Sequence, residues 1–169
     1  MLRKAILLFN TLKYLKLSQI LGRIERNFVR LRPDLSSAPS TSVPTNKFQS
    51  IVQCQPKMLN ESKFRFLNVT ADVLRTEDWN SPNQDKLWLY NLHYFDDLNS
   101  NEADQKVDWH RNLIQRWINE NPPGFGNGWE AYPSSLRIVN WIKWSLSGNI
   151  FEQESLDSLA IQVRYLSTN

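Results

Sequence analysis

The amino-acid sequence predicts a mainly α-helical protein with a short β-hairpin near residues 50–75. Apolar residues recur at helical spacing in the C-terminal half, where Trp109, Leu113 and Trp117 lie four residues apart. Loops rich in Pro and Gly, such as residues 121–128, separate such segments. Alternating helices and short loops are typical of a helical barrel or bundle.

Composition divides the chain into three segments. Residues 1–32 are expected to form a basic amphipathic helix, because apolar residues recur on one helical face, namely Leu17, Ile20, Leu21, Ile24 and Phe28. Residues 33–47 are rich in Pro and Ser and predict a linker or an extended loop. Residues 48–169 are expected to form a partial helical domain.

Within the third segment, we expect a hairpin followed by four helices. Residues 63–68 alternate briefly and predict a strand, with a partner in residues 51–53 or 69–74. Helices are expected at residues 87–98, at 107–119, from the first turn at Pro133 to about Ser147, and from near Glu152 onward. Four apolar residues share one face of the last helix: Leu156, Leu159, Val163 and Leu166.

The aromatic content is high, with seven Trp, five Tyr and eight Phe. Such rings fill a core, and they also stack on the apolar faces of sugars; for any single ring the core is the more common place. The single cysteine, Cys54, forms no internal disulfide, and His93 and His110 lack metal-ligand spacing. No metal and no other cofactor is expected.

Charge is unevenly distributed. The first 34 residues carry a net charge of +6, whereas the whole chain carries +3, so residues 35–169 are net −3. A basic N-terminal segment suits an acidic polysaccharide, lipid headgroups or nucleic acid, and equally a solvated helix face. No nucleic-acid-binding signature accompanies it, so no nucleic acid is expected, and peripheral membrane contact through this helix stays open.

Targeting signals are weak. No stretch approaches the ~18–20 consecutive apolar residues of a membrane span. The apolar run of residues 5–9 is shorter than the ~7–15 residues of a signal-peptide core, so the N-terminus is interpreted as a helix and not as an export signal.

Two clusters of polar and aromatic residues have both a functional and a structural interpretation. On a continuous helix, His93 would face Asp96 and Asp97, which would fix its tautomer; alternatively, His93 makes an N-capping or interhelical hydrogen bond. Arg137 and Asn140, close to Trp141 and Trp144, suit an anionic sugar. The alternative is an Arg137 ion-paired to Glu130 or Asp96 in a core filled by the Trp rings.

Longer motifs carry a resemblance to a known family. They are Phe64-Arg-Phe-Leu-Asn68, Leu87-Trp-Leu-Tyr-Asn-Leu-His-Tyr-Phe-Asp-Asp-Leu98, Trp117-Ile-Asn-Glu-Asn-Pro122 and Gly128-Trp-Glu-Ala-Tyr-Pro-Ser-Ser-Leu-Arg-Ile-Val-Asn-Trp-Ile-Lys-Trp144. In order and spacing they resemble the N-terminal region of heparinase II/III-like proteins over roughly residues 60–168. The chain departs where Ala131 stands for a usual Pro and Ser134 for a usual Thr.

The resemblance implies the N-terminal part of an incomplete α/α toroid, which a β-sandwich follows in the family. It implies a polysaccharide lyase acting on uronic-acid-containing glycans by β-elimination, in the cell envelope or periplasm. The family's catalytic residues lie further along, so the chain resembles a truncated member with no catalytic residue. The substrate-binding residues that match family motifs are Asn91, His93, Tyr94, Trp129, Tyr132, Arg137 and Asn140.

Three functions are therefore weighed. The first is a lyase segment that is inactive alone and needs the missing C-terminal part of the toroid and the β-sandwich as partners. The second is a non-catalytic carbohydrate-binding or scaffold module of a polysaccharide biosynthesis system. The third, a basic-helix module acting at membranes or nucleic acid, depends on residues 3–32 alone.

Overall fold

The computed structural model describes residues 32–40 and 54–168, together with Lys16. The chain forms two compact units, Met1–Arg32 and Pro33–Asn169. The basic helix predicted for residues 1–32 lies outside the described residues except for Lys16 and Arg32, and residues 41–53 lie outside them as well. The features that follow belong to the second unit.

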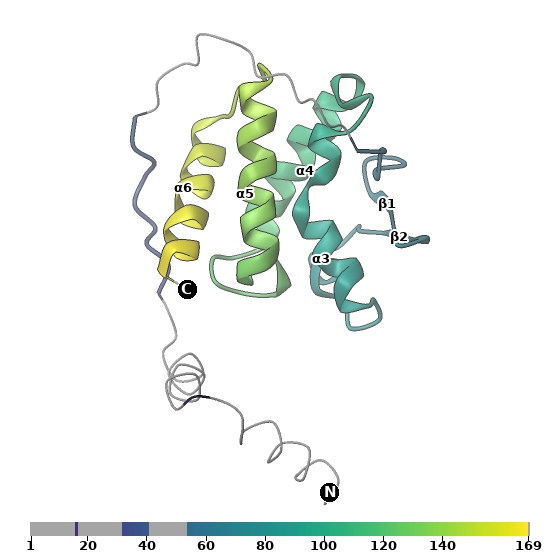
Figure 1. Ribbon diagram of the computed structural model, residues 1–169, viewed down its shortest axis with the longest axis horizontal. Coiled ribbons are helices and arrows are strands. Elements are labelled where there is room, and N and C mark those ends of the chain that lie inside the picture. The colour runs from purple at the N-terminus through teal and green to yellow at the C-terminus, as the bar shows by residue number, and fades with distance from the viewer. Residues whose placement is uncertain (1–15, 17–31, 41–53, 169) are drawn as a thin grey trace, which may run out of the picture. The chain divides into compact units, whose positions relative to one another are not determined.

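The described part of the second unit is mainly helical with a two-stranded antiparallel sheet, as the sequence predicts. Helices α3, α5 and α6 lie side by side in Figure 1, α4 lies behind them, and the hairpin flanks α3. Short 3-10 turns join the elements: Thr76–Asn80, Asp96–Asn99, Ala103–Lys106 and Asn127–Trp129.

The predicted hairpin is confirmed, with its partner strand on the C-terminal side. Strand β1 (Lys63–Phe66) pairs with β2 (Val69–Asp72). Leu67 and Asn68 connect them, both at positive φ, as in a type I′ two-residue hairpin turn. Phe64 and Phe66 point to the buried side of β1, because alternate residues of a strand face the same way.

The first predicted helix is shorter than expected. Helix α3 (Lys86–Tyr94) begins where the Asp85 side chain accepts a hydrogen bond from the Leu87 amide at 2.8 Å. It ends because Phe95 adopts a left-handed conformation with φ 60°. The ring of Phe95 then packs edge-on against Trp117 and Trp141, and this burial offsets the backbone strain.

The other three helices match their predicted ranges closely. They are α4 (Val107–Glu120), α5 (Ala131–Leu146) and α6 (Gln153–Thr168). Pro133 lies in the first turn of α5, where its missing N–H costs no helical hydrogen bond. Gly148 follows α5 at φ 106°, a conformation open to glycine.

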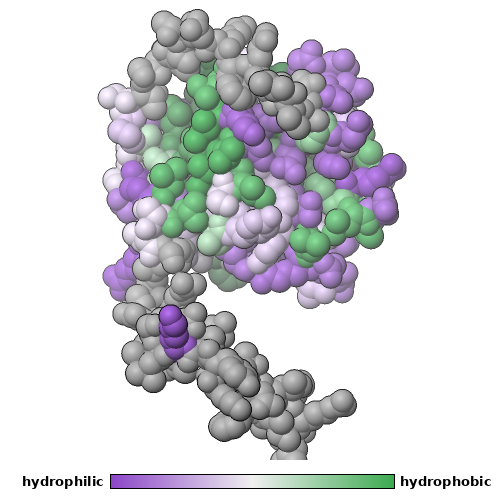
Figure 2. Space-filling model, viewed as in Figure 1, coloured by the Kyte–Doolittle hydropathy of each residue, from purple (hydrophilic) through white to green (hydrophobic). Residues whose placement is uncertain are grey.

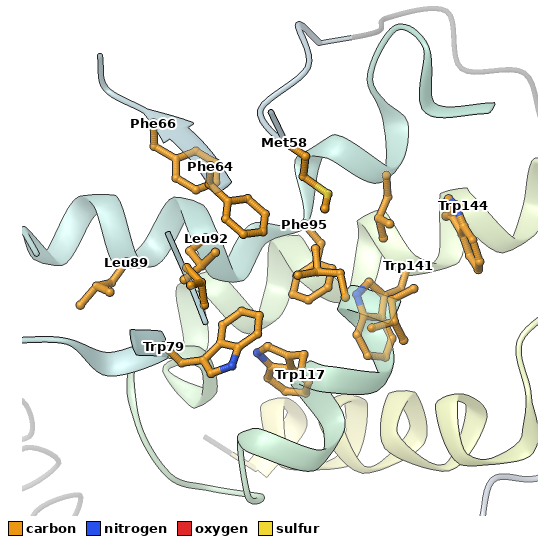
Figure 3. Packing of buried hydrophobic residues seen from close by; sticks show 14 of the residues in the cluster. Met58, Phe64, Phe66, Trp79, Leu89, Leu92, Phe95, Trp117, Trp141 and Trp144 are labelled. Atoms are coloured by element: carbon orange, nitrogen blue, oxygen red, sulfur yellow. The ribbon is translucent and has the colours of Figure 1, made fainter. Parts of the chain in front are cut away.

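A cluster of aromatic and aliphatic side chains forms the core. Figure 3 shows Trp117 between Trp79 on one side and Trp141 on the other, with Phe66 and Leu89 toward one edge and Trp144 at the other. Trp117 packs edge-on against Trp141 with ring centroids 5.8 Å apart, a geometry that the charge distribution of aromatic rings favours.

The fully buried residues of helix α6 are polar, although half-buried apolar residues also pack against this core, among them Ile161 and Tyr165. Its buried residues are Ser155, Ser158 and Gln162. Leu156 and Leu159 pack against the core only in part, and Val163 is 44% exposed. Figure 2 shows the resulting apolar band on the surface over α5 and α6, to which Val139 and Ile142 of α5 also contribute.

The described part of the predicted linker lies along α6. Residues 33–40 form no regular element. The Ala38 amide donates to Asp157 Oδ1 at 2.7 Å, and Arg164 Nε lies 3.3 Å from Asp34 Oδ2. Hydrogen bonds and an ion pair therefore hold these residues against the helix.

Candidate functional site

The structure separates the seven predicted site residues by exposure. Tyr132 is 60% exposed and Asn91 is half-buried. The other five are buried: His93, Tyr94, Trp129, Arg137 and Asn140. Only Tyr132 and Asn91 therefore present much side-chain surface to a ligand, while the rest form a frame beneath them.

Three tyrosines form what we call the tyrosine strip: Tyr90 and Tyr94 of α3 and Tyr132 of α5. The Tyr132 ring lies 5.7 Å from that of Tyr94, edge-on, and 6.4 Å from that of Tyr90. Tyr90 and Tyr94 share one face of α3 because they are four residues apart. Tyr94 is buried and the Tyr90 hydroxyl is bonded to Glu130, so the exposed ring of Tyr132 is the part of the strip on which the apolar face of a sugar could stack.

An ion pair closes one end of the strip. Lys86 Nζ lies 3.0 Å from Glu130 Oε1, and the Tyr90 hydroxyl donates to Glu130 Oε2. Lys86 also lies 5.2 Å from the centre of the Tyr90 ring. The N-terminal ends of α3 and α5 are thereby joined at the surface.

Asn140 closes the other end. Its Nδ2 donates to the Tyr94 carbonyl oxygen at 2.9 Å and to Asp96 Oδ1 at 2.8 Å. Asn99 in turn donates to the side-chain oxygen of Asn140 at 3.2 Å. Asn140 thus satisfies a carbonyl left free at the end of α3 and orients the half-buried Asp96 carboxylate.

Tyr94 keeps its proton across the neutral range. Burial raises its pKa to about 12, and the neighbouring Tyr132 and Asp96 add to the rise. The phenol can therefore donate a hydrogen bond, and it does not act as an anion at neutral pH.

Arg137 lies in the frame beneath the strip and is fully buried. Its Nε donates to Gln162 Oε1 at 2.8 Å, and its Nη1 donates to the carbonyl oxygens of Gly128 at 2.8 Å and His93 at 3.3 Å. Nη2 reaches the Ser134 hydroxyl at 3.4 Å. One guanidinium thus joins α3, α5, α6 and the loop before α5.

Neither ion pair expected for Arg137 is formed. Glu130 pairs with Lys86 at the surface, and Asp96 accepts from Asn140. The expectation that Arg137 would lie inside the core is correct, but its acceptors there are neutral. Its role as a contact to a sugar carboxylate stays a prediction, because in this conformation the guanidinium donates its hydrogen bonds to groups of the protein.

His93 lies beside Arg137 and holds a defined tautomer. The indole N–H of Trp117 donates to Nδ1 at 3.0 Å, so Nε2 carries the proton and donates to the Trp79 carbonyl at 3.0 Å. Burial, together with the Arg137 charge, lowers the pKa of His93 to about 3. A Cβ at Gly128 would lie 2.7 Å from Nδ1, so only glycine lets the loop pass so close.

The predicted pairing of His93 with Asp96 or Asp97 is wrong. Because Phe95 ends α3, both aspartates leave the helical face of His93. Asp97 instead lies 3.0 Å from His110 Nε2 and accepts from the Met58 amide at 2.9 Å. The alternative interpretation, an interhelical hydrogen bond of His93, is confirmed.

Asp97 is a buried carboxylate that joins His110 to the backbone of residues 57 and 58, and the sequence interpretation missed it. Burial raises its pKa, but the hydrogen bonds from His110 and from the backbone amides of Met58 and Lys57 outweigh this, so the pKa lies below the ordinary value. Asp97 and His110 are thirteen residues apart, so no short motif connects them. Tyr90 was also missed, although its four-residue spacing from Tyr94 was visible in the sequence.

Several comparisons give negative results. The described part of the chain holds no group of three or more His, Cys, Asp or Glu side chains suited to a metal ion. It also contains no helix both long and apolar enough to cross a membrane. Comparison with protein-family models, curated proteins and solved structures finds no match.

Proposed function

We propose that the chain is the N-terminal, substrate-cleft part of the helical toroid of a heparinase II/III-like polysaccharide lyase, and that the tyrosine strip contacts the glycan. The observation that carries the proposal is Tyr132, a ring 60% exposed and held edge-on by Tyr94. An exposed ring that is already oriented loses little entropy when a sugar stacks on it. The mainly helical fold is compatible with a part of such a toroid.

The proposed reaction of the whole enzyme is β-elimination at a uronic acid. A base removes the C5 proton, a C4–C5 double bond forms, and the bond from C4 to the leaving oxygen breaks as an acid protonates that oxygen. Neutralisation of the C6 carboxylate stabilises the developing enolate. His93 and His110 are both fully buried, so neither imidazole reaches a sugar. This supports a role for the chain in binding, with the chemistry carried by the rest of the enzyme.

The charge around the strip indicates which groups of the glycan it would contact. Glu130 neutralises Lys86, and among the described residues the Asp96 carboxylate has one hydrogen-bond partner, the amide of Asn140. The cationic excess of the chain lies in residues 1–34, at net +6. We therefore propose that uncharged sugar faces stack on the strip, while the acidic groups of the polysaccharide are attracted by the basic N-terminal segment.

Binding of heparan sulfate and alginate to the purified chain tests the proposal. Tyr132→Ala should weaken binding about tenfold, the loss expected for one stacked ring. Phe125→Ala is the matched control, because Phe125 is 66% exposed and makes no ring contact among the described residues. Equal losses for both variants, or none for Tyr132→Ala, would count against the strip.

Elimination activity tests the second half of the proposal. The chain alone should release no unsaturated uronate, measured by ultraviolet absorbance, from heparin, heparan sulfate or alginate. Steady release of unsaturated product by the purified chain would show that catalytic residues lie within it and would overturn the proposed division of labour.

Burial of both histidines also favours a second function, a non-catalytic carbohydrate-binding or scaffold module of a polysaccharide biosynthesis system. The full-length gene product separates the two functions. Unsaturated uronate would support the lyase, whereas glycan binding that depends on Tyr132 without elimination would support the module.

A further inference from the structure

The hairpin of β1 and β2 has one covered edge and one open edge. Residues 57–59 run along the outer side of β1. The Arg65 amide donates to the Lys57 carbonyl oxygen at 2.9 Å, and the Leu59 amide donates to that of Lys63 at 2.8 Å. Figure 1 shows the hairpin at the margin of the helices, beside α3. β2 therefore forms the open edge of the small sheet.

Backbone groups of Thr70 and Asp72 point outward from that edge. In an antiparallel pair, residues that exchange hydrogen bonds across the ladder alternate with residues that do not. The Val73 amide donates to the Ser62 carbonyl oxygen at 2.7 Å, so Asp72 next to it turns its N–H and C=O groups away from β1, and so does Thr70. None of these four groups has a hydrogen-bond partner among the residues that the structure describes, and both residues are exposed.

The sequence of β2 carries none of the usual protections of an open edge. Edge strands are commonly protected by Pro, by Lys, by a bulge or by an unpaired charge. β2 has the sequence Val-Thr-Ala-Asp, and its register with β1 is regular over all four residues. Its one charge is already paired, because Lys63 Nζ lies 3.5 Å from Asp72 Oδ2. The edge is therefore open to pairing with a further strand.

The edge is complementary to itself. A second copy of β2, running antiparallel about a twofold axis at Ala71, places Thr70 of each copy opposite Asp72 of the other. The amide and carbonyl groups of each such pair then bond to each other, which gives four hydrogen bonds across the axis. Ala71 meets Ala71 of the second copy at a position without hydrogen bonds, where Cα atoms lie about 4.5 Å apart and a small side chain fits.

Side chains on the solvent face match in the same arrangement. Arg65 Nε donates to the Thr70 hydroxyl at 3.3 Å, and the proton of that hydroxyl has no acceptor among the described residues. In the pair, Asp72 of the second copy lies opposite Thr70, within reach of that proton. Lys63 and Arg65 then lie at the two ends of a row that has the carboxylate and the hydroxyl between them. No like charges stand directly opposite each other across the axis, so charge favours the pairing.

We propose that the chain pairs with a second copy of itself through β2, so that the two hairpins form one four-stranded antiparallel sheet with Ala71 on the twofold axis. A contact between two short strands is small, so the dissociation constant should be on the order of 100 µM. The proposal goes beyond the proposed function and does not depend on it, because no residue of the tyrosine strip lies on β2.

Disulfide cross-linking tests the register. Ala71→Cys is made together with Cys54→Ser, so that the introduced thiol is the only one in the chain. Oxidation by copper–phenanthroline should give a covalent dimer, because a Cα separation of about 4.5 Å lies within the range of disulfides.

Val69→Cys in the same background is the matched control. Val69 lies on the same face of β2 as Ala71 and is more exposed, so random collisions would cross-link it more readily. In the proposed pair its two copies are offset by four residues along the strands, about 13 Å, which is too far for a disulfide. It should therefore yield less than about a tenth of the dimer given by Ala71→Cys.

Sedimentation velocity measures the association itself, with Val163→Lys as the parent so that the apolar band over α5 and α6 does not contribute. Thr70→Pro removes an outward amide and no bond to β1, and should weaken association at least about tenfold. Thr70→Val keeps the amide and loses the hydroxyl, and should weaken it about threefold. The Trp88 indole resonance reports whether the hairpin is intact, because this N–H donates to the Val69 carbonyl oxygen at 3.0 Å.

Three results would overturn the proposal: equal cross-linking of Ala71→Cys and Val69→Cys, a parent that stays monomeric up to about 1 mM, or unchanged association of Thr70→Pro with an intact hairpin. If Thr70→Pro disturbs the hairpin, the cross-linking comparison decides alone. A monomeric parent that pairs β2 with a strand of another protein also counts against a second copy as the occupant. None of these results bears on the loss expected for Tyr132→Ala, so failure of the pairing and failure of the strip are distinguishable.

Discussion

Helices α4 and α6 pack against the same core through different kinds of side chain. α4 buries Leu113, Ile114 and Trp117. α6 fully buries Ser155, Ser158 and Gln162, while its apolar residues pack against the core only half-buried. Burial of apolar area holds α4, whereas α6 combines half-buried apolar contacts, such as Tyr165 edge-on against Trp129, with a hydrogen bond between Gln162 and the buried Arg137.

The difference teaches that an amphipathic pattern does not by itself tell which face of a helix turns inward. A buried guanidinium must have acceptors, because an unpaired buried charge costs more than the apolar area that a different rotation of α6 would bury. Arg137 therefore determines the rotation of α6, and the apolar side of α6 remains partly open to solvent.

The largest effect is expected for α4. Trp117→Ala should lower the free energy of unfolding by about 3–5 kcal/mol, because it leaves a cavity and removes the donor to His93. Urea titration measures the change. Asn119→Ala, on the exposed side of the same helix, should stay within ~0.5 kcal/mol, and comparable losses in both would argue against a core role for Trp117.

The next effect is on the pH dependence of stability, through the buried imidazole of His93. The pKa of His93 is about 3 in the folded chain against an ordinary 6.5. Protons bind the unfolded chain first as the pH falls below 6.5, so stability is full above this value and declines toward pH 3. The slope is about 1.4 kcal/mol per pH unit, measured by urea titration at several pH values.

The control for that slope is His93→Gln, which keeps an amide donor and acceptor but does not titrate. Its stability should be lower at pH 7 and flatter between pH 6 and 4.5 than that of the native chain. If the slopes of the two proteins are the same, His93 is not the group that senses acid.

A smaller effect is expected at the anchor of α6. Gln162→Leu leaves the Arg137 Nε–H without an acceptor and should cost about 1–3 kcal/mol. Amide hydrogen exchange should accelerate in α6 more than in α4. Gln162→Glu keeps the acceptor oxygen and should restore protection; a loss as large as that of Gln162→Leu would contradict the proposed anchor.

The smallest effect on stability is expected at the apolar band. Val163→Lys should change the free energy of unfolding by no more than ~0.5 kcal/mol, because Val163 is 44% exposed. The same change should reduce self-association of the chain, measured by sedimentation velocity, since it interrupts the exposed apolar surface. A native chain that is already monomeric at all concentrations would contradict this expectation.

Much of the fold follows from local sequence. The alternation of residues 63–68 predicts β1, and Pro133 and Gly148 bracket α5, because strand alternation and backbone restrictions are properties of neighbouring residues. The early end of α3 could not be predicted from local sequence. The left-handed conformation of Phe95 is stabilised by contacts of its ring with Trp117 and Trp141, which are distant in sequence.

The candidate site divides in the same way. The aromatic and polar character of residues 90–94 and 129–140 is visible in the sequence, and so is the four-residue spacing of Tyr90 and Tyr94. Which rings reach solvent is not visible, because exposure depends on what packs above each ring. Tyr132 is exposed and Trp129 buried, although they are three residues apart.

The sequence by itself determined the mainly helical class, the hairpin and most helix limits, since these depend on contacts within a few residues. The tertiary structure alone decided that Arg137 and His93 belong to a buried network, that Asp97 pairs with His110, and that α6 turns polar residues inward. Those outcomes depend on which distant groups satisfy each buried donor and acceptor, and that choice is made only when the helices pack.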